Sequence, residues 1–236
     1  MTQKEQVVTA MRKNGGYANF QQLNQTIDFT SWGTKTPQAS VRRIVQTNEE
    51  FFRITSGLWG LSEAKQEILR KLDISENVKD SIENFNHGYI QGIIAEIGRI
   101  KGFDTYVPPQ DKNRKFIDKR LSDVTSIQQI FEFTYSEIVR FAKTVDVIWF
   151  NKRKMPNAFY EVEHTTDMRN SLSKFYELQD FRSKFYIVAP EERKRQYEDV
   201  VSRSIYKDIK NLVGFVGYDT LIRQYEKEII SVDGAI

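Results

Sequence analysis

Three acidic residues lie in two apolar, strand-like segments near the middle of the chain. Asp146 lies within the apolar run 145–150, and Glu161 and Glu163 flank Val162. Because side chains alternate along a strand, Glu161 and Glu163 are expected on the same face. A buried carboxylate without a partner is costly, so three of them on neighbouring strands predict a cation between them. Oxygen ligands of this kind suit Mg²⁺, and the usual task of Mg²⁺ beside carboxylates is phosphate chemistry.

The elements around these acids follow a recognisable order. A helix opens at His87-Gly88 and ends at Lys101-Gly102, and its isoleucines recur at helical spacing. A strand stopped by Pro108-Pro109 follows, and the two acid-bearing strands come after a basic loop and a further helix with apolar Ile127, Ile130, Phe131 and Phe133. After them come a helix and a strand, and then a charged helix at about 191–208, a fifth strand at 213–216 and a last helix at 219–230. The predicted order is therefore αβββαβ, with the strands at 104–107, 144–150, 158–163 and 185–189 and the second helix at 167–182.

This order, over residues 86–190, resembles the PD-(D/E)XK nuclease fold, in which a mixed sheet is flanked by helices. In that resemblance Asp146 takes the position of the family's aspartate, and Glu161 takes its first acidic position after the turn. Glu163 stands where the family usually has lysine, although some restriction enzymes with this fold carry Glu-x-Glu. Four segments carry the resemblance: Asp104-x-Tyr-Val-Pro-Pro-x-Asp, Val145-Asp-Val-Ile-Trp, Phe159-Tyr-Glu-Val-Glu-His-Thr-Thr and Tyr186-Ile-Val-Ala-Pro.

The resemblance implies a Mg²⁺-dependent hydrolysis of phosphodiester bonds. Asp146, Glu161 and the carbonyl of Val162 would hold the metal ion. Glu163 would orient or deprotonate the attacking water, or bind a second metal ion. Lys174, on the following helix, is a candidate to return the missing positive charge.

The first helix of this domain offers one further carboxylate. Glu96 is a candidate catalytic residue, and Gln91, earlier on the same helix, is the alternative. An ordinary surface charge on an amphipathic helix explains Glu96 equally well.

The first sixty residues predict three helices followed by a hairpin, which together make a winged helix. Helices are expected at 3–13, at 17–25 and after Thr36-Pro37, where Thr36 suits an N-cap and Pro37 the first turn. With the segment Gly57-Leu58-Trp59-Gly60-Leu61, residues 1–62 resemble the HARE-HTH family. That resemblance implies that the third helix enters a DNA groove, although many winged helices contact proteins instead. Its exposed polar residues, Gln38, Arg42 and Arg43, are the candidate DNA contacts.

These patterns divide the chain into a winged-helix domain at 1–64, a linker helix at 65–85 and an endonuclease-like domain at 86–236. The expected fold class is thus α+β for the first domain and α/β for the second. Two basic clusters adjoin the acid-bearing strands, in the segments 110–123 and 151–157. Such clusters can follow a phosphate backbone, although a solvated face, or ion pairs with the nearby acids, would also account for them. The candidate contacts are Lys112, Arg114, Lys115, Lys152, Arg153 and Lys154.

Composition excludes several other classes. The chain has 236 residues, a net charge of +3, no cysteine and two histidines, so disulfides, Cys-based zinc sites and multi-His sites are excluded. We interpret His87 as a cap or surface residue and His164 as packed behind the site, on the opposite face to Glu163. With no apolar run of membrane-spanning length and no signal-peptide core, we expect no membrane partner and a cytoplasmic location.

The resulting hypothesis is a type II restriction endonuclease that cuts double-stranded DNA with Mg²⁺. A homodimer is expected, since a two-fold protein matches a palindromic target cut in both strands. Two alternatives stay open. One is a DNA-binding regulator whose nuclease-like domain is inactive, which the missing lysine favours, and the other is a modification-dependent endonuclease.

Overall fold

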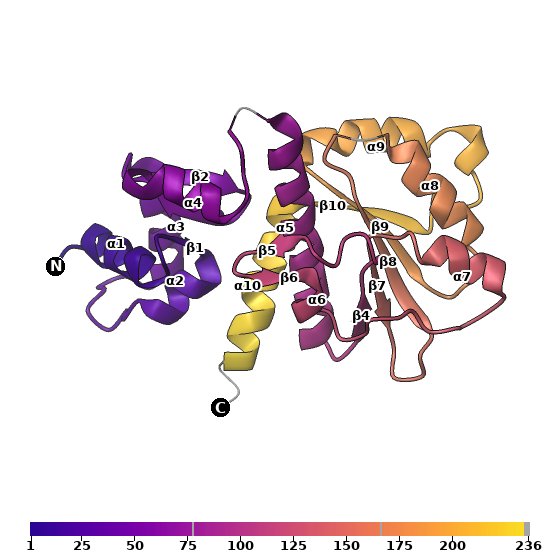
Figure 1. Cartoon of the computed structure of the whole chain (residues 1–236), viewed down its shortest axis with the longest axis horizontal. Helices are drawn as coiled ribbons and strands as arrows, with labels where there is room; N and C mark the ends of the chain where they lie inside the picture. The colour runs from indigo at the N-terminus through magenta and orange to yellow at the C-terminus, as the bar shows by residue number, and fades with distance from the viewer. Residues whose placement is uncertain (77, 166, 234–236) are drawn as a thin grey trace. The chain divides into compact units, whose positions relative to one another are not determined.

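The computed structural model describes residues 1–76, 78–165 and 167–233. The chain forms two compact units, Met1–Val78 and Lys79–Ile236, each with its own core (Figure 1). No helix in the described ranges is both long enough and apolar enough to cross a membrane.

The first unit packs four helices against a three-stranded antiparallel sheet of order β1-β3-β2. The predicted hairpin is present as β2 and β3, and its turn contains Gly57 with a φ of +77°. Buried residues of the helices, among them Met11, Leu23 and Val45, form the core with Phe51 of β2. The elements of this unit are α1 (Gln3–Lys13), β1 (Tyr17–Asn19), α2 (Phe20–Thr26), α3 (Pro37–Thr47), β2 (Phe51–Thr55), β3 (Leu58–Leu61) and α4 (Lys65–Lys71), with a 3-10 turn at Ser62–Ala64.

Two predictions for this unit need correction. The helix expected at 17–25 begins only at Phe20, because residues 17–19 pair with β3 as a short strand. Asn19 then caps α2, and its side chain accepts a hydrogen bond from the Gln22 amide at 2.8 Å. The Thr36 side chain, by contrast, makes no capping hydrogen bond to α3.

The segment expected to be a linker helix does not form one element. Its first part, α4, lies within the first unit and buries Ile68 and Leu69. Its last part, from Lys79, is the start of the long helix α5 of the second unit.

The second unit is a five-stranded mixed sheet between two layers of helices. The strand order is β10-β9-β8-β7-β4, in which β4, β7 and β8 are antiparallel neighbours and β8, β9 and β10 run parallel. The main elements keep the predicted order α5, β4, β7, β8, α8, β9, but the helix predicted around residues 127–133 is absent, and these residues lie between α6 and α7. Its strands are β4 (Asp104–Tyr106), β5 (Lys115–Phe116), β6 (Lys119–Arg120), β7 (Val147–Phe150), β8 (Pro156–Val162), β9 (Lys184–Ala189) and β10 (Val213–Gly217). Its helices are α5 (Lys79–Ile100), α6 (Leu121–Val124), α7 (Ser136–Ala142), α8 (Met168–Glu177), α9 (Lys194–Val201) and α10 (Tyr218–Asp233), with 3-10 turns at Glu191–Arg193 and Ser204–Tyr206.

The helices of the second unit form two layers, one on each face of the sheet. Helices α5 and α10 lie on one side of the sheet, and α7, α8 and α9 lie on the other (Figure 1). Phe159 of β8 is buried in the core under α8. Because side chains alternate along β8, Glu161 and Glu163 face the same layer as Phe159. Helix α8 also links β8 to β9, since parallel neighbours require such a crossover.

Helix α5 starts at Lys79, two turns before the predicted start at His87-Gly88. The glycine was expected to mark a helix boundary, but it lies inside the helix where another segment passes closely. A Cβ at Gly88 would lie 3.0 Å from the Cβ of Arg114 and 3.2 Å from the carbonyl oxygen of Lys115. His87 is therefore a mid-helix residue, and the interpretation of His87 as a cap is wrong.

Candidate active site

Asp146 lies at the centre of a group of polar side chains, directly before β7. Its carboxylate is largely buried, with 13% of the side chain exposed. Its Oδ2 accepts a hydrogen bond from the Val162 amide at 2.7 Å, and its own amide donates to Glu161 Oε1 at 3.3 Å. Asp146 Oδ1 lies 3.2 Å from His87 Nε2. The two oxygens of Asp146 thus face different neighbours.

Glu161 is buried and paired with Lys174. The Nζ of Lys174 lies 2.9 Å from both carboxylate oxygens and also donates to the Thr144 carbonyl at 2.9 Å. The burial of Glu161 raises the pKa of its carboxyl to about 8, and the Asp146 carboxylate adds to this increase while Lys174 opposes it. Lys174 therefore supplies a positive charge beside Glu161, as the sequence suggested for this position on α8.

Glu163 shares a hydroxyl with Glu161. Ser171 of α8 lies 3.0 Å from Glu161 Oε2 and also contacts Glu163 Oε1. A hydroxyl has a single proton, so it can donate to only one of the two carboxyl groups at a time. The Glu163 backbone is held as well, because its carbonyl accepts from Arg193 Nη1 at 2.7 Å.

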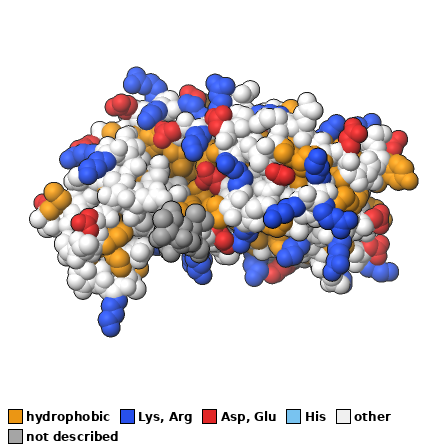
Figure 2. Space-filling view, turned by 90° about the horizontal axis from the view of Figure 1, so that it is seen from below, with side chains coloured by type: hydrophobic (Ala, Val, Ile, Leu, Met, Phe, Trp, Pro, Cys, Tyr) orange, Lys and Arg blue, Asp and Glu red, His pale blue; other side chains and the backbone are white. Residues whose placement is uncertain are grey.

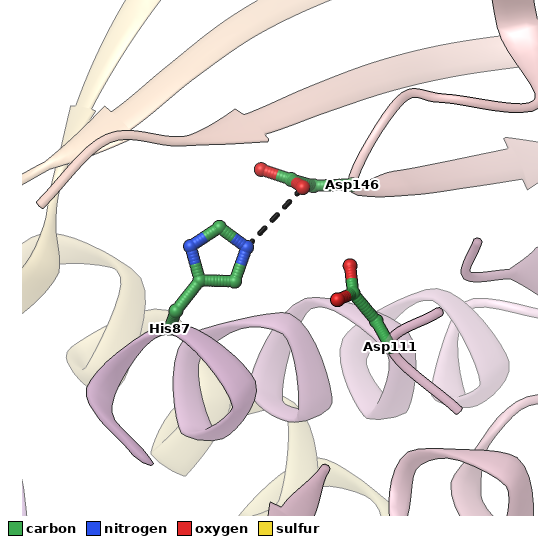
Figure 3. A group of neighbouring side chains, drawn as sticks. All are labelled: His87, Asp111 and Asp146. Carbon is green, nitrogen blue, oxygen red and sulfur yellow. Dashed lines mark ion pairs between the residues drawn. The ribbon is translucent and has the colours of Figure 1, made fainter. Parts of the chain in front are cut away.

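A second group of side chains meets Asp146 from the α5 side. His87 of α5 and Asp111, in the loop between β4 and β5, point toward Asp146 (Figure 3). One ligand atom from each of the three residues lies within 4.8 Å of the other two. Gln91, one turn after His87, donates through Nε2 to Asp111 Oδ2 at 2.9 Å and to the Asp146 carbonyl at 3.2 Å. Arg114 Nε donates to Asp111 Oδ1 at 2.6 Å.

The donors present here suit a divalent cation. Carboxylate oxygens and an imidazole nitrogen are common ligands of such ions. Gln91 is fully buried, and its Oε1 has no hydrogen-bond partner among the described protein atoms. A buried polar atom of this kind normally has a hydrogen-bond partner. A metal-bound water would be such a partner for Gln91 Oε1. Residues His87, Gln91 and Asp111 were not predicted as a group, because they are far apart in sequence and only α5 and the β4–β5 loop bring them to Asp146.

Two other residues considered from the sequence lie away from this group. Glu96 faces α10, where its Oε2 accepts a hydrogen bond from the Tyr225 hydroxyl. The structure therefore brings Gln91, and not Glu96, to the acids. His164 stacks on Tyr218 with ring centroids 6.0 Å apart, and its burial lowers the pKa of the imidazole.

The basic residues predicted to contact DNA differ in their contacts within the protein and in their exposure. Arg114 is engaged with Asp111, and Lys112 Nζ donates to the Gln128 carbonyl. Lys154 Nζ lies 5.3 Å from the centre of the Phe131 ring. Among the other candidate contacts, Lys115 is partly buried, and Lys152 and Arg153 are exposed.

On the face drawn in Figure 2, charge alone does not outline a DNA-binding surface. Lys and Arg side chains are scattered there among Asp and Glu side chains rather than gathered in one patch. In the first unit, Gln38 and Arg43 of α3 are exposed. Arg42 is partly buried, with its guanidinium 4.4 Å from the centre of the Phe20 ring.

Residues 69–231 match a family described as the C-terminal domain of the type II restriction enzyme NmeDI. This match spans more than half of the chain, so the chain belongs to that restriction-enzyme family.

A curated relative is the type II restriction enzyme NmeDI of Neisseria meningitidis serogroup C. The two are 32% identical over 116 residues, which cover 45% of this chain and 33% of the relative. The chain thus matches about a third of the relative's length. No solved structure matches the chain.

Proposed function

We propose that this protein is a divalent-metal-dependent, sequence-specific endonuclease of double-stranded DNA that acts as a type II restriction enzyme. Its membership of a restriction-enzyme family supports the proposal. The observation that carries it is the meeting of buried Asp146 and Glu161 with the Lys174 ammonium. We further propose that the second unit is a PD-(D/E)XK core, which the order of its elements and strands supports.

Phosphodiester hydrolysis needs an in-line water and stabilisation of the negative charge that develops on the phosphate and the leaving oxygen. A cation such as Mg²⁺ supplies part of that stabilisation and lowers the pKa of a bound water. In this proposal Asp146 holds the cation, with Glu161 and the Val162 carbonyl as the other ligands predicted from the sequence.

Three further side chains would act around that centre. Lys174 places its ammonium beside Glu161, so it is suited to stabilise charge on the scissile phosphate. Glu163 is suited to orient the attacking water or accept its proton. Ser171 contacts both glutamates and keeps their carboxyl groups close together.

The first unit is proposed to grip DNA as a winged helix of the HARE-HTH type. Its three helices and the hairpin β2–β3 support this, as do the exposed Gln38 and Arg43 on α3. In the second unit Lys152 and Arg153 are the exposed candidates for phosphate contacts. We also propose a homodimer, because two sites related by a two-fold axis cut both strands of a palindromic target.

Digestion of an unmodified supercoiled plasmid tests the proposal. Wild-type protein should give discrete fragments with Mg²⁺ or Mn²⁺ and none with EDTA, while Asp146→Ala should lose at least about a thousandfold in rate but still bind DNA. A dimer should yield linear DNA without accumulation of nicked circles. Equal cutting by Asp146→Ala would contradict the assigned site. Binding without any cutting would favour a regulator, and cutting confined to modified plasmid would favour a modification-dependent enzyme.

A further inference from the structure

We infer that His87, Asp111 and Asp146 form the principal cation site of this protein, a mixed imidazole–carboxylate site that binds Mn²⁺ more tightly than Mg²⁺. The inference rests on the proposed function, because it names the metal ligands of the same site. It differs from the ligand set Asp146, Glu161 and Val162 that the sequence predicts.

The orientation of Asp146 is the first reason. Its Oδ2 is occupied by the Val162 amide at 2.7 Å, whereas Oδ1 is directed to His87 Nε2 at 3.2 Å. A cation bound by Oδ1 would therefore lie on the α5 side of the sheet. Asp111 is already there, and Figure 3 shows all three side chains converging.

The surroundings of Glu161 are the second reason. Both of its carboxylate oxygens lie 2.9 Å from Lys174 Nζ, and Oε2 also lies 3.0 Å from the Ser171 hydroxyl. This carboxylate thus already has a cationic partner and a hydrogen-bond donor. Moving it onto a metal ion would break those contacts, whereas His87 Nε2 and Asp146 Oδ1 already face each other at 3.2 Å.

The support behind the three ligands is the third reason. Gln91 Nε2 bridges Asp111 Oδ2 and the Asp146 carbonyl, and Arg114 Nε fixes the other oxygen of Asp111. Partners that orient metal ligands in this way are typical of built metal sites. The buried Gln91 Oε1, which has no partner in the described part of the protein, would accept a hydrogen bond from a metal-bound water.

The ligand types then decide which ions bind well. Mg²⁺ prefers oxygen ligands, whereas an imidazole ligand favours divalent ions of the first transition row, of which Mn²⁺ is the one that also suits carboxylate and water. Mn²⁺ accepts both carboxylate and imidazole. We therefore expect the protein to bind Mn²⁺ at least about ten times more tightly than Mg²⁺.

The test is Mn²⁺ binding by the full chain without DNA, measured by isothermal titration and by pulsed electron paramagnetic resonance. The chain has two histidines, so His164→Asn is a matched control for His87→Asn. Wild type and His164→Asn should both show ¹⁴N coupling from a directly bound imidazole. His87→Asn should lose that coupling and bind Mn²⁺ at least about tenfold more weakly, as should Asp111→Asn.

Other results would overturn the inference. Absence of ¹⁴N coupling from an imidazole in the wild-type Mn²⁺ complex would overturn it. This measurement needs no substitution, so the test does not depend on the folding of a variant. Unchanged affinity in His87→Asn and Asp111→Asn, together with weaker binding in Glu161→Gln, would place the ion between Asp146 and Glu161.

Plasmid cleavage is measured separately with Mn²⁺ and with Mg²⁺. If Mn²⁺ binds through His87 but no DNA is cut, the metal site stands and the nuclease function fails. If DNA is cut while His87 makes no contact with the ion, the function stands and this site assignment fails.

Discussion

At the scale of single residues, the pairing of Glu161 with Lys174 is the most consequential feature of the site. A buried carboxylate next to Asp146 would be costly without a cation. Lys174 provides that cation from α8, thirteen positions along the chain from Glu161. The protein thus places an ammonium close to the acids, even though Glu163 occupies the strand position at which the proposed PD-(D/E)XK core would usually carry lysine.

Lys174→Met should destabilise the folded protein more at pH 9 than at pH 5. The pKa of Glu161 is raised from 4.5 to about 8, so the folded protein holds a proton that the unfolded chain releases, and stability falls as pH rises between these values. Loss of Lys174 raises this pKa further. At pH 5 Glu161 is neutral in wild type and in the variant, so no ion pair is lost. At pH 9 wild type has the buried Glu161–Lys174 ion pair, which the variant lacks. Removing one partner of such a pair costs roughly 3 kcal/mol of stability. Urea unfolding in EDTA at both pH values measures the difference.

Lys143→Met is the control, because Lys143 is exposed at the end of α7 and its loss should change stability little at either pH. A destabilisation by Lys174→Met that is the same at pH 5 and pH 9 would show that Lys174 acts only through its hydrogen bond to the Thr144 carbonyl.

The residues of the site were predictable only where local geometry decides their position. The two-residue period of a strand places Glu161 and Glu163 on one face, and both do contact Ser171. The contact of Lys174 depends on the register of α8 and could only be suggested. His87 and Asp111 meet Asp146 through tertiary packing, which no spacing in the sequence records.

At the scale of elements, helix α5 carries His87 and Gln91, and its distance from the sheet sets where these side chains lie. Gly98 allows the close approach, because a Cβ there would lie 2.6 Å from both Thr105 Cγ2 and Trp149 Nε1. The Trp149 Nε1 group in turn donates to the Ile94 carbonyl at 3.1 Å. The strands and the second helix could be predicted from apolar runs and turn residues, but the start of α5 could not. Its internal glycines look like boundaries in the sequence and act as packing positions in the fold.

Gly98→Ala should therefore destabilise the protein by about 1–3 kcal/mol, the usual cost of overpacking. Helix propensity alone would change stability in the opposite direction by about 1 kcal/mol. Gly33→Ala is the matched control, since a Cβ at Gly33 meets no atom within 4 Å. Urea unfolding followed by tryptophan fluorescence measures both variants. A Gly98→Ala protein as stable as wild type would show that α5 can move away from the sheet without loss.

At the scale of the whole molecule, the chain combines two units with separate cores. The described residues of the candidate active site all belong to the second unit. The family match covers residues 69–231 and so leaves most of the first unit outside it. If the first unit contributes DNA affinity, a change on α3 should weaken binding without changing the cation site.

Arg43→Ala tests this in an Asp146→Ala background, which should bind DNA without cutting it. Arg43 is exposed on α3, and removing one phosphate contact should weaken binding several-fold and reduce the slope of log affinity against log salt by about 1. Lys13→Ala removes the same charge from α1 and should leave that slope nearly unchanged. Fluorescence anisotropy with a labelled duplex at several salt concentrations provides the measurement. Mn²⁺ binding by Arg43→Ala alone should equal that of wild type. Equal weakening of DNA binding by Lys13→Ala and by Arg43→Ala would mean that the first unit attracts DNA through its general charge, and not through α3.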